Sequence, residues 1–243
     1  MKKTVLLASL VLALSLGASA QYRDFSFGFK LGPGFDWTGS TTGAAVNQGV
    51  RAGFGLGVVA EYYFTDNYAI VSGINVNMLR GHYSFTNARL ENEALVTFPV
   101  DRYYKSTVFE IPVMLKMITN QLGALPFRYY AQMGAGIGYA HKVMVRDGNN
   151  GAAAPEAYGT SNKEFSNLRF GLKIGAGAQY SIDESLRVFA GIYYSHDFIN
   201  NINYIRPNHY ANYYDANLTK IGERDTKLNL LQNRFGIEVG ILF

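Results

Sequence analysis

The stretch Phe235-Gly-Ile-Glu-Val-Gly-Ile-Leu-Phe243 ends the chain and decides its fold. Apolar side chains occupy every second position from 235 to 243, and Gly236, Glu238 and Gly240 lie between them. Side chains two residues apart share one face of a β-strand, so this stretch is a strand with a single apolar face. A last strand that ends on an aromatic residue is typical of outer-membrane barrels. We expect Phe243 to act as their membrane-insertion signal.

The first 20 residues have the pattern of an export signal. Lys2 and Lys3 form a positive start, residues 5–16 are apolar, and the small residues at 18–20 resemble a cleavage site. The apolar run is shorter than the roughly 20 residues of a membrane-spanning helix. We expect residues 1–20 to be a signal peptide and residues 21–243 to form one mature domain.

The composition indicates a membrane protein without apolar blocks. Hydrophobic residues make up 48% of the chain, although the mean hydropathy is only −0.03. This distributed signal is typical of a transmembrane β-barrel. The absence of cysteine excludes a disulfide framework. No Lys/Arg run follows residue 3, so the formal charge of +4 gives no reason to expect a nucleic-acid partner.

Eight segments alternate with a period of two, and their glycines lie on the polar side of the alternation. A soluble sandwich fills its inner face with large apolar side chains. Here the large apolar residues lie opposite glycine, alanine and charged residues, which predicts a lipid-facing exterior and a narrow polar lumen. The segments are 25–32, 53–64, 68–78, 109–117, 127–139, 168–180, 186–195 and 235–243.

Short and long connections alternate along the chain, as they do between the periplasmic turns and extracellular loops of membrane barrels. We therefore predict an all-β fold, a transmembrane up-and-down antiparallel β-barrel of eight strands with both termini in the periplasm. Ten strands would follow if segment 84–104 or 199–229 held another hairpin. The short links are 65–67, 119–126 and 183–185, and the long ones are 38–50, 84–104, 146–165 and 199–229.

Several short motifs resemble the PorT-like family of small outer-membrane barrels. They are Phe-Gly-Phe-Lys-Leu-Gly at 27–32, Glu-Ile-Pro-Val-Met-Leu-Lys at 110–116, Gly-Ala-Gly-Ile-Gly-Tyr at 134–139 and the closing Gly-Ile-Leu-Phe. An Ile-Pro pair is common on the fourth strand of that family, so the resemblance implies that Pro112 is tolerated as a bulge. One member is linked to protein secretion, but the resemblance implies a fold and a location rather than an activity.

Charged residues on the inward side of the alternation predict a polar network in the lumen. The last and first strands of a closed barrel are neighbours, so we expect Glu238 to pair with Lys30. Because an unpaired buried charge costs several kcal/mol, this network would fix the register and block flow. The alternative is a narrow anion-selective channel, although an eight-stranded interior has room only for side chains or one small ligand. The expected network residues are Lys30, Glu110, Lys173, Arg234 and Glu238.

The segment 200–218 is the candidate binding loop. Tyrosine and asparagine form adaptable contact surfaces, and loops this long are often functional. The partner would be an envelope or secretion protein or an extracellular ligand, and the alternative is a solvated loop. The candidate contact residues are Tyr204, Tyr210, Tyr213 and Tyr214.

Catalytic and metal sites have little support. His82 and Ser84 share a strand face, as in a lipid A deacylase-type esterase, but only Glu91 or Glu93 would orient the histidine. In Ser195-His196-Asp197 the alternation turns the histidine away from its neighbours. The four histidines have no ligand spacing.

We therefore expect no catalytic residue, metal or cofactor. The predicted function is a non-enzymatic envelope structural component, or a binding and assembly partner, in the outer membrane of a Gram-negative bacterium. Its expected partners are outer-membrane lipids and, during insertion, the barrel-assembly machinery.

Overall fold

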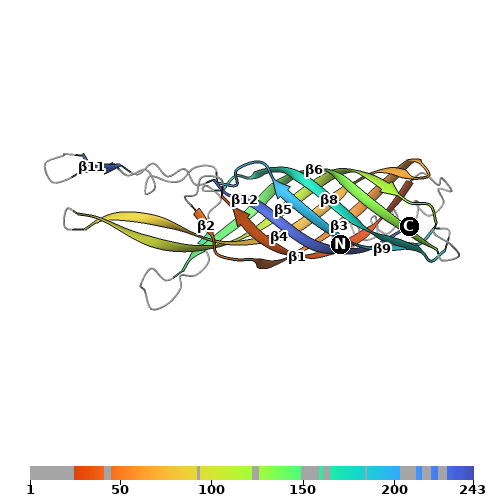
Figure 1. The fold of residues 1–243 in the computed structure, drawn as a ribbon, viewed down its shortest axis with the longest axis horizontal. Helices are drawn as coiled ribbons and strands as arrows, with labels where there is room; N and C mark the ends of the chain where they lie inside the picture. The colour runs from red at the N-terminus through yellow and green to blue at the C-terminus, as the bar shows by residue number, and fades with distance from the viewer. Residues whose placement is uncertain are drawn as a thin grey trace, which may run out of the picture.

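Eight long antiparallel strands close into a barrel in the computed structural model of the protein (Figure 1). The strands are β1 (Phe25–Gly39), β3 (Arg51–Thr65), β4 (Tyr68–Glu91), β5 (Ala94–Ile118), β6 (Phe127–Asp147), β8 (Leu168–Ser181), β9 (Arg187–Asp197) and β12 (Leu231–Leu242). Each pairs with its neighbours in this order, and β12 pairs with β1. The predicted all-β, eight-stranded up-and-down barrel is confirmed.

The structure describes residues 25–40, 45–91, 94–121, 126–148, 159–160, 165–183, 185–202, 212–214, 220–223 and 229–243. The predicted signal peptide lies outside these ranges. In the described part of the chain, no helix has the length and apolarity to cross a membrane.

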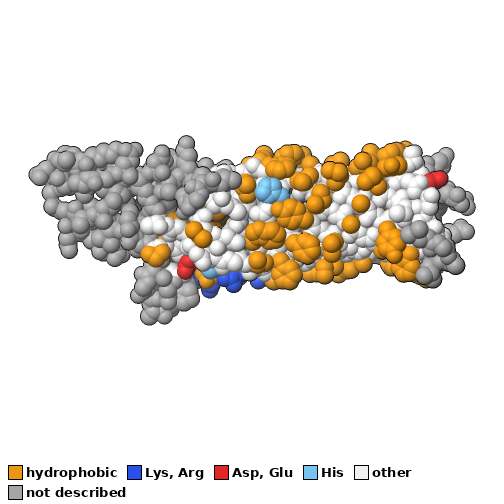
Figure 2. All heavy atoms as spheres, viewed as in Figure 1, with side chains coloured by type: hydrophobic (Ala, Val, Ile, Leu, Met, Phe, Trp, Pro, Cys, Tyr) orange, Lys and Arg blue, Asp and Glu red, His pale blue; other side chains and the backbone are white. Residues whose placement is uncertain are grey.

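The outside of the barrel is apolar, as the alternation predicts. Phe29, Ile137 and Ile237 point outward and are 46%, 58% and 51% exposed. Figure 2 shows hydrophobic side chains spread over the face of the barrel that is in view. An exterior of this kind needs hydrocarbon around it, and a closed barrel leaves no unpaired strand edge within that hydrocarbon.

The start of β1 and the end of β12 lie together at the barrel end that has the short turns. The backbone amide of Phe243 donates to the carbonyl of Phe27 (2.8 Å), and the amide of Phe27 donates back (3.3 Å). The β3–β4 and β8–β9 turns lie at this same end, which is the periplasmic end on the rule that short turns face the periplasm.

Segment 84–104 is not a loop, and this expectation was wrong. β4 and β5 pair without interruption of register from Tyr68↔Met117 to Glu91↔Ala94, so they continue beyond the barrel as a two-stranded ribbon. The ribbon escaped the sequence pattern because it lies beyond the hydrophobic band. There the contrast between lipid and lumen no longer imposes the apolar alternation of the barrel segments.

The ribbon adds no strand to the barrel wall. Four short strands also lie outside the wall: β2 (Ala45–Asn47) pairs with β4, β7 (Gly159–Thr160) pairs with β6, and β10 (Asn212–Tyr214) pairs with β11 (Lys220–Glu223). The alternative of ten barrel strands is therefore wrong.

Pro112 does not form a bulge, contrary to what the family resemblance implies. Ser72 pairs with Val113 and Asn75 pairs with Glu110, so the β4–β5 register is unchanged across the proline. The Ser72 hydroxyl donates to the Pro112 carbonyl at 2.8 Å. The bulge of β5 lies elsewhere, at Thr107/Val108 against β6.

Candidate functional site

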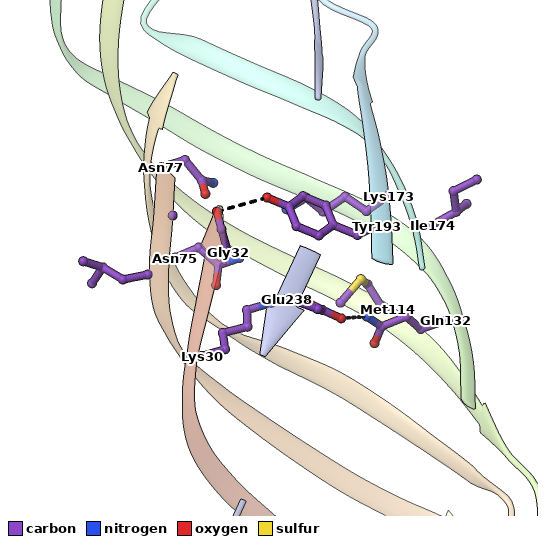
Figure 3. Close-up of a pocket in the computed structure, with 12 residues that line it drawn as sticks. Lys30, Gly32, Asn75, Asn77, Met114, Gln132, Lys173, Ile174, Tyr193 and Glu238 are labelled. Atoms are coloured by element: carbon purple, nitrogen blue, oxygen red, sulfur yellow. Dashed lines mark hydrogen bonds and ion pairs between the residues drawn. The ribbon is translucent and has the colours of Figure 1, made fainter. Parts of the chain in front are cut away.

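Charged and polar side chains from several strands meet inside the barrel. Lys30 on β1 and Glu238 on β12 lie 3.4 Å apart between Nζ and Oε2. Glu238 Oε1 also accepts a hydrogen bond from Gln132 Nε2 at 2.7 Å (Figure 3). Tyr130 Oη, also on β6, donates to the same oxygen at 3.3 Å. Because β6 and β12 are not neighbours in the sheet, these bonds cross the lumen.

A second cross-lumen group surrounds Glu110 on β5. Lys173 Nζ on β8 lies 2.6 Å from Glu110 Oε1. On β4, the amides of Asn77 and Asn75 donate to the same carboxylate at 2.9 and 3.5 Å. The Glu110 carboxylate thus links its own strand, β5, to β4 and β8.

Arg234 belongs to a third group, nearer the extracellular end. Its Nε lies 3.5 Å from Asp36 Oδ1, and its Nη2 donates to the Gly32 carbonyl at 3.3 Å. Asp36 Oδ2 accepts from the backbone amide of Arg80 at 3.0 Å. Beside this group, Arg169 Nη1 donates to Asp197 Oδ2 at 2.9 Å.

The structure thus places all five predicted network residues inside the barrel, and it shows Lys30 with Glu238 and Lys173 with Glu110. The alternation also predicts Glu61, Lys116, Arg169 and Arg187 inside the lumen, nearer its ends, but it missed two acidic members. Asp36 and Asp197 lie just beyond the alternating segments, and the pairing of Glu61 with Lys116 depends on a register that the sequence does not give. Extending the inward positions by two residues past Ser195 finds Asp197, and extending them by four residues past Gly32 finds Asp36.

The pair formed by Glu61 and Lys116 is the most enclosed. Lys116 Nζ lies 2.5 Å from Glu61 Oε1, and both side chains are almost fully buried. The Tyr63 hydroxyl donates to Glu61 at 2.5 Å, and the ring of Tyr130 lies 4.4 Å from the Lys116 ammonium. Hydrogen bonds and a ring face thus satisfy both charges, which an ion pair in a low dielectric requires.

Each of the five inner carboxylates named here, all in the described strands, has a basic partner. The pairs are Glu61 with Lys116, Glu110 with Lys173, Glu238 with Lys30, Asp36 with Arg234 and Asp197 with Arg169. Arg187 adds one more cation, which donates to the Tyr63 hydroxyl at 2.9 Å and to Ser26 Oγ. The charges of these described inner residues are therefore nearly balanced.

Small cavities lie between the charged groups of the lumen. Two cavities of about 30 Å³ each lie among these charged groups. One is lined by Lys30, Asn75 and Gln132, and the other by Arg169, Ser195 and Arg234. Each has room for one or two waters.

Apolar clusters pack inside the barrel toward both of its ends. At the periplasmic end, Met114, Phe189 and Leu242 pack with their neighbours. At the extracellular end, Tyr83, Tyr104 and Phe165 belong to a larger buried cluster. The arrangement can hold the strands in register and exclude bulk water.

The two serine–histidine candidates do not form catalytic arrangements. Ser84 Oγ accepts from Gln48 Nε2 at 2.6 Å, whereas His82 Nδ1 lies 2.8 Å from Arg51 Nη2 and 2.9 Å from the Gln48 carbonyl. The partial burial of His82 and the Arg51 guanidinium lower its pKa. The side chains of Glu91 and Glu93 lie outside the described residues.

The alternation also separates Ser195-His196-Asp197. His196 Nδ1 lies 2.6 Å from Asn233 Oδ1 on the outer face, whereas Asp197 pairs inside with Arg169. No group of three or more metal-ligating side chains occurs in the described ranges.

The predicted loop residues cannot be placed. Tyr204 and Tyr210 lie outside the described residues. Tyr213 and Tyr214 belong to β10, which pairs with β11, but their side chains are not described. Phe243 is described: it is 45% exposed, and its ring centroid lies 5.8 Å from that of Phe27.

Comparison with solved structures finds small outer-membrane proteins. Surface protein A of Neisseria is 13% identical, with 89% of this chain and 95% of that chain covered at a TM-score of 0.41. OprG of Pseudomonas aeruginosa is 11% identical, with 90% and 94% covered at a TM-score of 0.42. Ail of Yersinia pestis, solved with a heparin analogue, is 11% identical, with 90% and 99% covered at 0.34.

No curated protein sequence matches the chain. A family model for the outer membrane protein beta-barrel domain matches residues 16–203. This match agrees with the closed eight-stranded barrel and its apolar exterior. The chain therefore belongs to the outer membrane protein beta-barrel domain family, and its place is the outer membrane of a Gram-negative bacterium.

Proposed function

We propose that this protein is a non-enzymatic surface component in which a sealed barrel anchors an extracellular β-ribbon that binds a partner. The observation that carries the proposal is the combination of a filled lumen with strands that continue past the membrane. β4 and β5 are 24 and 25 residues long, whereas roughly 9–11 residues suffice to cross a bilayer as a tilted strand.

The filled lumen supports an anchoring role rather than transport. A permeating ion would have to separate pairs such as Lys173 with Glu110, which cross the lumen at 2.6 Å. Removing one partner of a buried pair costs about 3–5 kcal/mol. The alternative of an anion-selective channel therefore requires a rearranged interior.

The base of the ribbon supports a binding role because it is rigid. β2 pairs with β4 at Tyr83, Ser84 and Phe85. On the inner face, the ring of Tyr104 lies 5.5 Å from that of Phe165 and 6.3 Å from that of Tyr83. A firmly held base lowers the entropy lost when the ribbon meets a partner.

The ribbon also offers strand edges. From Thr86↔Pro99 to Glu91↔Ala94, the described pairing joins β4 and β5 only to each other. Strands with free edges accept an added strand from a partner, a mode in which main-chain hydrogen bonds supply the affinity. The partner would be an envelope or secretion protein or an extracellular ligand.

The test compares two shortened proteins in the native envelope after in vivo crosslinking. Replacing residues 87–98 by Asn-Gly shortens the ribbon, and deleting residues 201–217 removes the tyrosine-rich loop. We expect the shortened ribbon to lose a partner that crosslinks stoichiometrically to the parent protein. Loss of the partner only on deletion of residues 201–217 would instead assign the contact to the loop. Retention of the same partner by both folded variants contradicts the proposal. So do steady anion-selective currents from the pure protein in planar bilayers.

Three narrower assignments belong to the same proposal. The four short motifs support membership of the PorT-like group, and Phe243 supports recognition by the barrel-assembly machinery. The start of the chain supports removal of residues 1–20. Sequencing the mature protein tests this removal, with Gln21 as the expected first residue. Loss of lipid hydrolysis in Ser84→Ala would instead favour a lipid A deacylase-type esterase.

A further inference from the structure

One small cavity of the lumen lies among three cationic side chains. Its volume is about 30 Å³, and Arg169 and Lys173 on β8 line it together with Arg234 on β12. In the sheet register, Lys173 pairs with Ser195 on β9, and Ser195 pairs with Arg234. These three residues therefore form one inward-facing row across neighbouring strands. We call this space the arginine cavity.

Glycines keep one wall of the arginine cavity free of side chains. Gly138 on β6 lies between Glu110 and Arg169 in the register. A Cβ added to Gly138 would lie only 2.9 Å from Val108 Cγ1, so a larger residue would crowd this wall. The backbone of β6 and β8 thus borders the space directly. The glycines that line it are Gly136, Gly138 and Gly171.

Two arginines of the arginine cavity have N–H groups without an acceptor. Arg169 and Arg234 are only 3% and 2% exposed. Arg169 Nε and Nη2 and Arg234 Nε have no hydrogen-bond partner among the described residues. Of the described side chains that line the cavity, only Gln232 offers an acceptor, Oε1, that also lacks a partner. Buried polar groups are nearly always hydrogen-bonded, and a charged donor without an acceptor is especially costly.

The charges that line the arginine cavity are uneven. Lys173 lies 2.6 Å from Glu110, and Arg169 lies 2.9 Å from Asp197, so two cations have carboxylates within the lining. The partner of Arg234 is Asp36, which does not line the cavity and whose Oδ1 lies 3.5 Å from Arg234 Nε. Arg234 thus has the longest of the three ion pairs. The described lining itself holds three cations and two carboxylates.

We propose that the arginine cavity binds one small monovalent anion of the size of chloride or bromide. Such an ion accepts hydrogen bonds from several directions and donates none, which suits three free N–H groups and one free acceptor. A water in the same place would also have to donate its two hydrogens. The volume has room for one halide ion but not for sulfate or phosphate.

The bound anion joins strands that do not pair with each other. Arg169 is on β8 and Arg234 is on β12, and β9 lies between these two strands in the sheet. The hydroxyl of Ser195 on β9 also lines the cavity and can donate to the same ion. The anion therefore completes the ion-pair network of the sealed lumen. The site does not depend on the partner of the ribbon.

The first measurement locates the ion in crystals of the full-length protein. The crystals are grown from neutral detergent with sodium bromide as the probe, and diffraction is recorded at the bromine absorption edge. In the parent protein we expect an anomalous peak within hydrogen-bonding distance of Arg169 and Arg234. A peak of this kind identifies a halide because a water scatters without an anomalous signal.

The second measurement compares thermal unfolding in detergent at constant ionic strength, followed by heat-modifiable migration on gels. The probes are sodium chloride, sodium bromide and sodium gluconate, whose anion is too large for the cavity. The test variant, Arg169→Gln/Asp197→Asn, removes one ion pair of the lining and keeps the net charge. The matched control, Lys30→Gln/Glu238→Gln, removes an inner ion pair that does not line the arginine cavity.

We expect the unfolding midpoint of the parent to be roughly 3 °C higher in either halide than in gluconate, because the ion binds the folded state. The control variant should keep this difference even if its midpoint is lower in every salt. The test variant should unfold at the same temperature in all three salts and should show no bromide peak.

Four outcomes would overturn the proposal. The parent could show no anomalous peak in the cavity, which would mean that water fills it. It could unfold at the same temperature in halide and gluconate, and a bromide peak would then indicate an adventitious ion only. The folded test variant could keep the halide dependence, or the control could lose it. None of these results bears on the ribbon and its partner.

Discussion

At the scale of single residues, the structure depends on charges that are buried in pairs. Glu61 and Lys116 are held 2.5 Å apart, and the adjacent Tyr63 and Tyr130 complete their surroundings. Neither charge has water to compensate for the loss of its partner. The cost of removing one is therefore larger than the net value of the pair itself.

Replacing Lys116 alone should destabilise the barrel strongly. We expect Lys116→Met to lower the free energy of unfolding by about 3–5 kcal/mol, and the double variant Glu61→Leu/Lys116→Met to recover most of that loss. Urea unfolding in lipid vesicles measures both. Lys142→Met, at an exposed lysine, is the control and should change stability by less than about 0.5 kcal/mol. A neutral Lys116→Met would contradict the account of the interior.

Gly73 is a second residue-scale constraint. Its φ is +151°, it lies opposite Pro112 in the β4–β5 register, and a Cβ built on it would overlap the carbonyl oxygen of Val58. We expect Gly73→Ala to destabilise the barrel by about 1–3 kcal/mol. Gly49→Ala is a comparison with positive φ but no atom within 4 Å of the added Cβ, and it should cost less. Equal losses in urea unfolding would mean that crowding at Gly73 has no effect.

At the scale of elements, the β8–β9 turn depends on one carboxylate. Asp183 Oδ1 accepts hydrogen bonds from the backbone amides of Leu186 (2.7 Å) and Ser185 (2.8 Å). These bonds hold the pKa of Asp183 below its ordinary value of 3.8. A carboxyl group with a lowered folded-state pKa stabilises the fold above its unfolded pKa, and this contribution is lost as the pH falls through the folded value.

The turn should therefore loosen in acid. We expect amide protection at Leu186 to be constant from pH 7 to about 5 and to fall below pH 4. In Asp183→Ala the protection should be low throughout and independent of pH in this range. Hydrogen exchange, expressed as protection factors, measures this. Protection that rises on acidification would contradict the assignment.

The seam between β1 and β12 is the element on which closure depends. Phe243 exchanges two backbone hydrogen bonds with Phe27 and contacts its ring. We expect deletion of Phe243 to slow insertion into the outer membrane more than Phe243→Tyr does, because only the deletion removes both the bonds and the ring. Pulse-labelled insertion assays follow the appearance of the heat-modifiable form. Equal rates for the parent and the deletion would remove Phe243 from the insertion signal.

The eight barrel strands could be predicted from sequence because lipid on one side and a narrow lumen on the other impose strict alternation, as from Phe54 to Phe64. The ribbon could not be predicted, because both of its faces lie outside that constraint. Inward charges such as Lys30 and Glu238 followed from alternation and from strand adjacency. Partners across the lumen, such as Gln132 with Glu238, depend on barrel shear, which alternation does not define.

At the scale of the whole molecule, the protein is an inside-out barrel. Its apolar side chains face the membrane, its ion pairs fill the axis, and its longest strands continue into the extracellular space. The first two features explain why a chain with a mean hydropathy of −0.03 belongs in a membrane. The third carries the proposed role of the ribbon in contacting other molecules.

The most direct test of this arrangement is spin-label accessibility along β12. The chain contains no cysteine, so single cysteines at positions 235–242 can be labelled without background. In lipid vesicles, we predict that accessibility to oxygen peaks at the outward positions 235, 237, 239 and 241 and is low at 236, 238 and 240. A water-soluble nickel chelate should reach neither set. Oxygen accessibility with the opposite phase, or chelate access along the inward positions, would contradict the account.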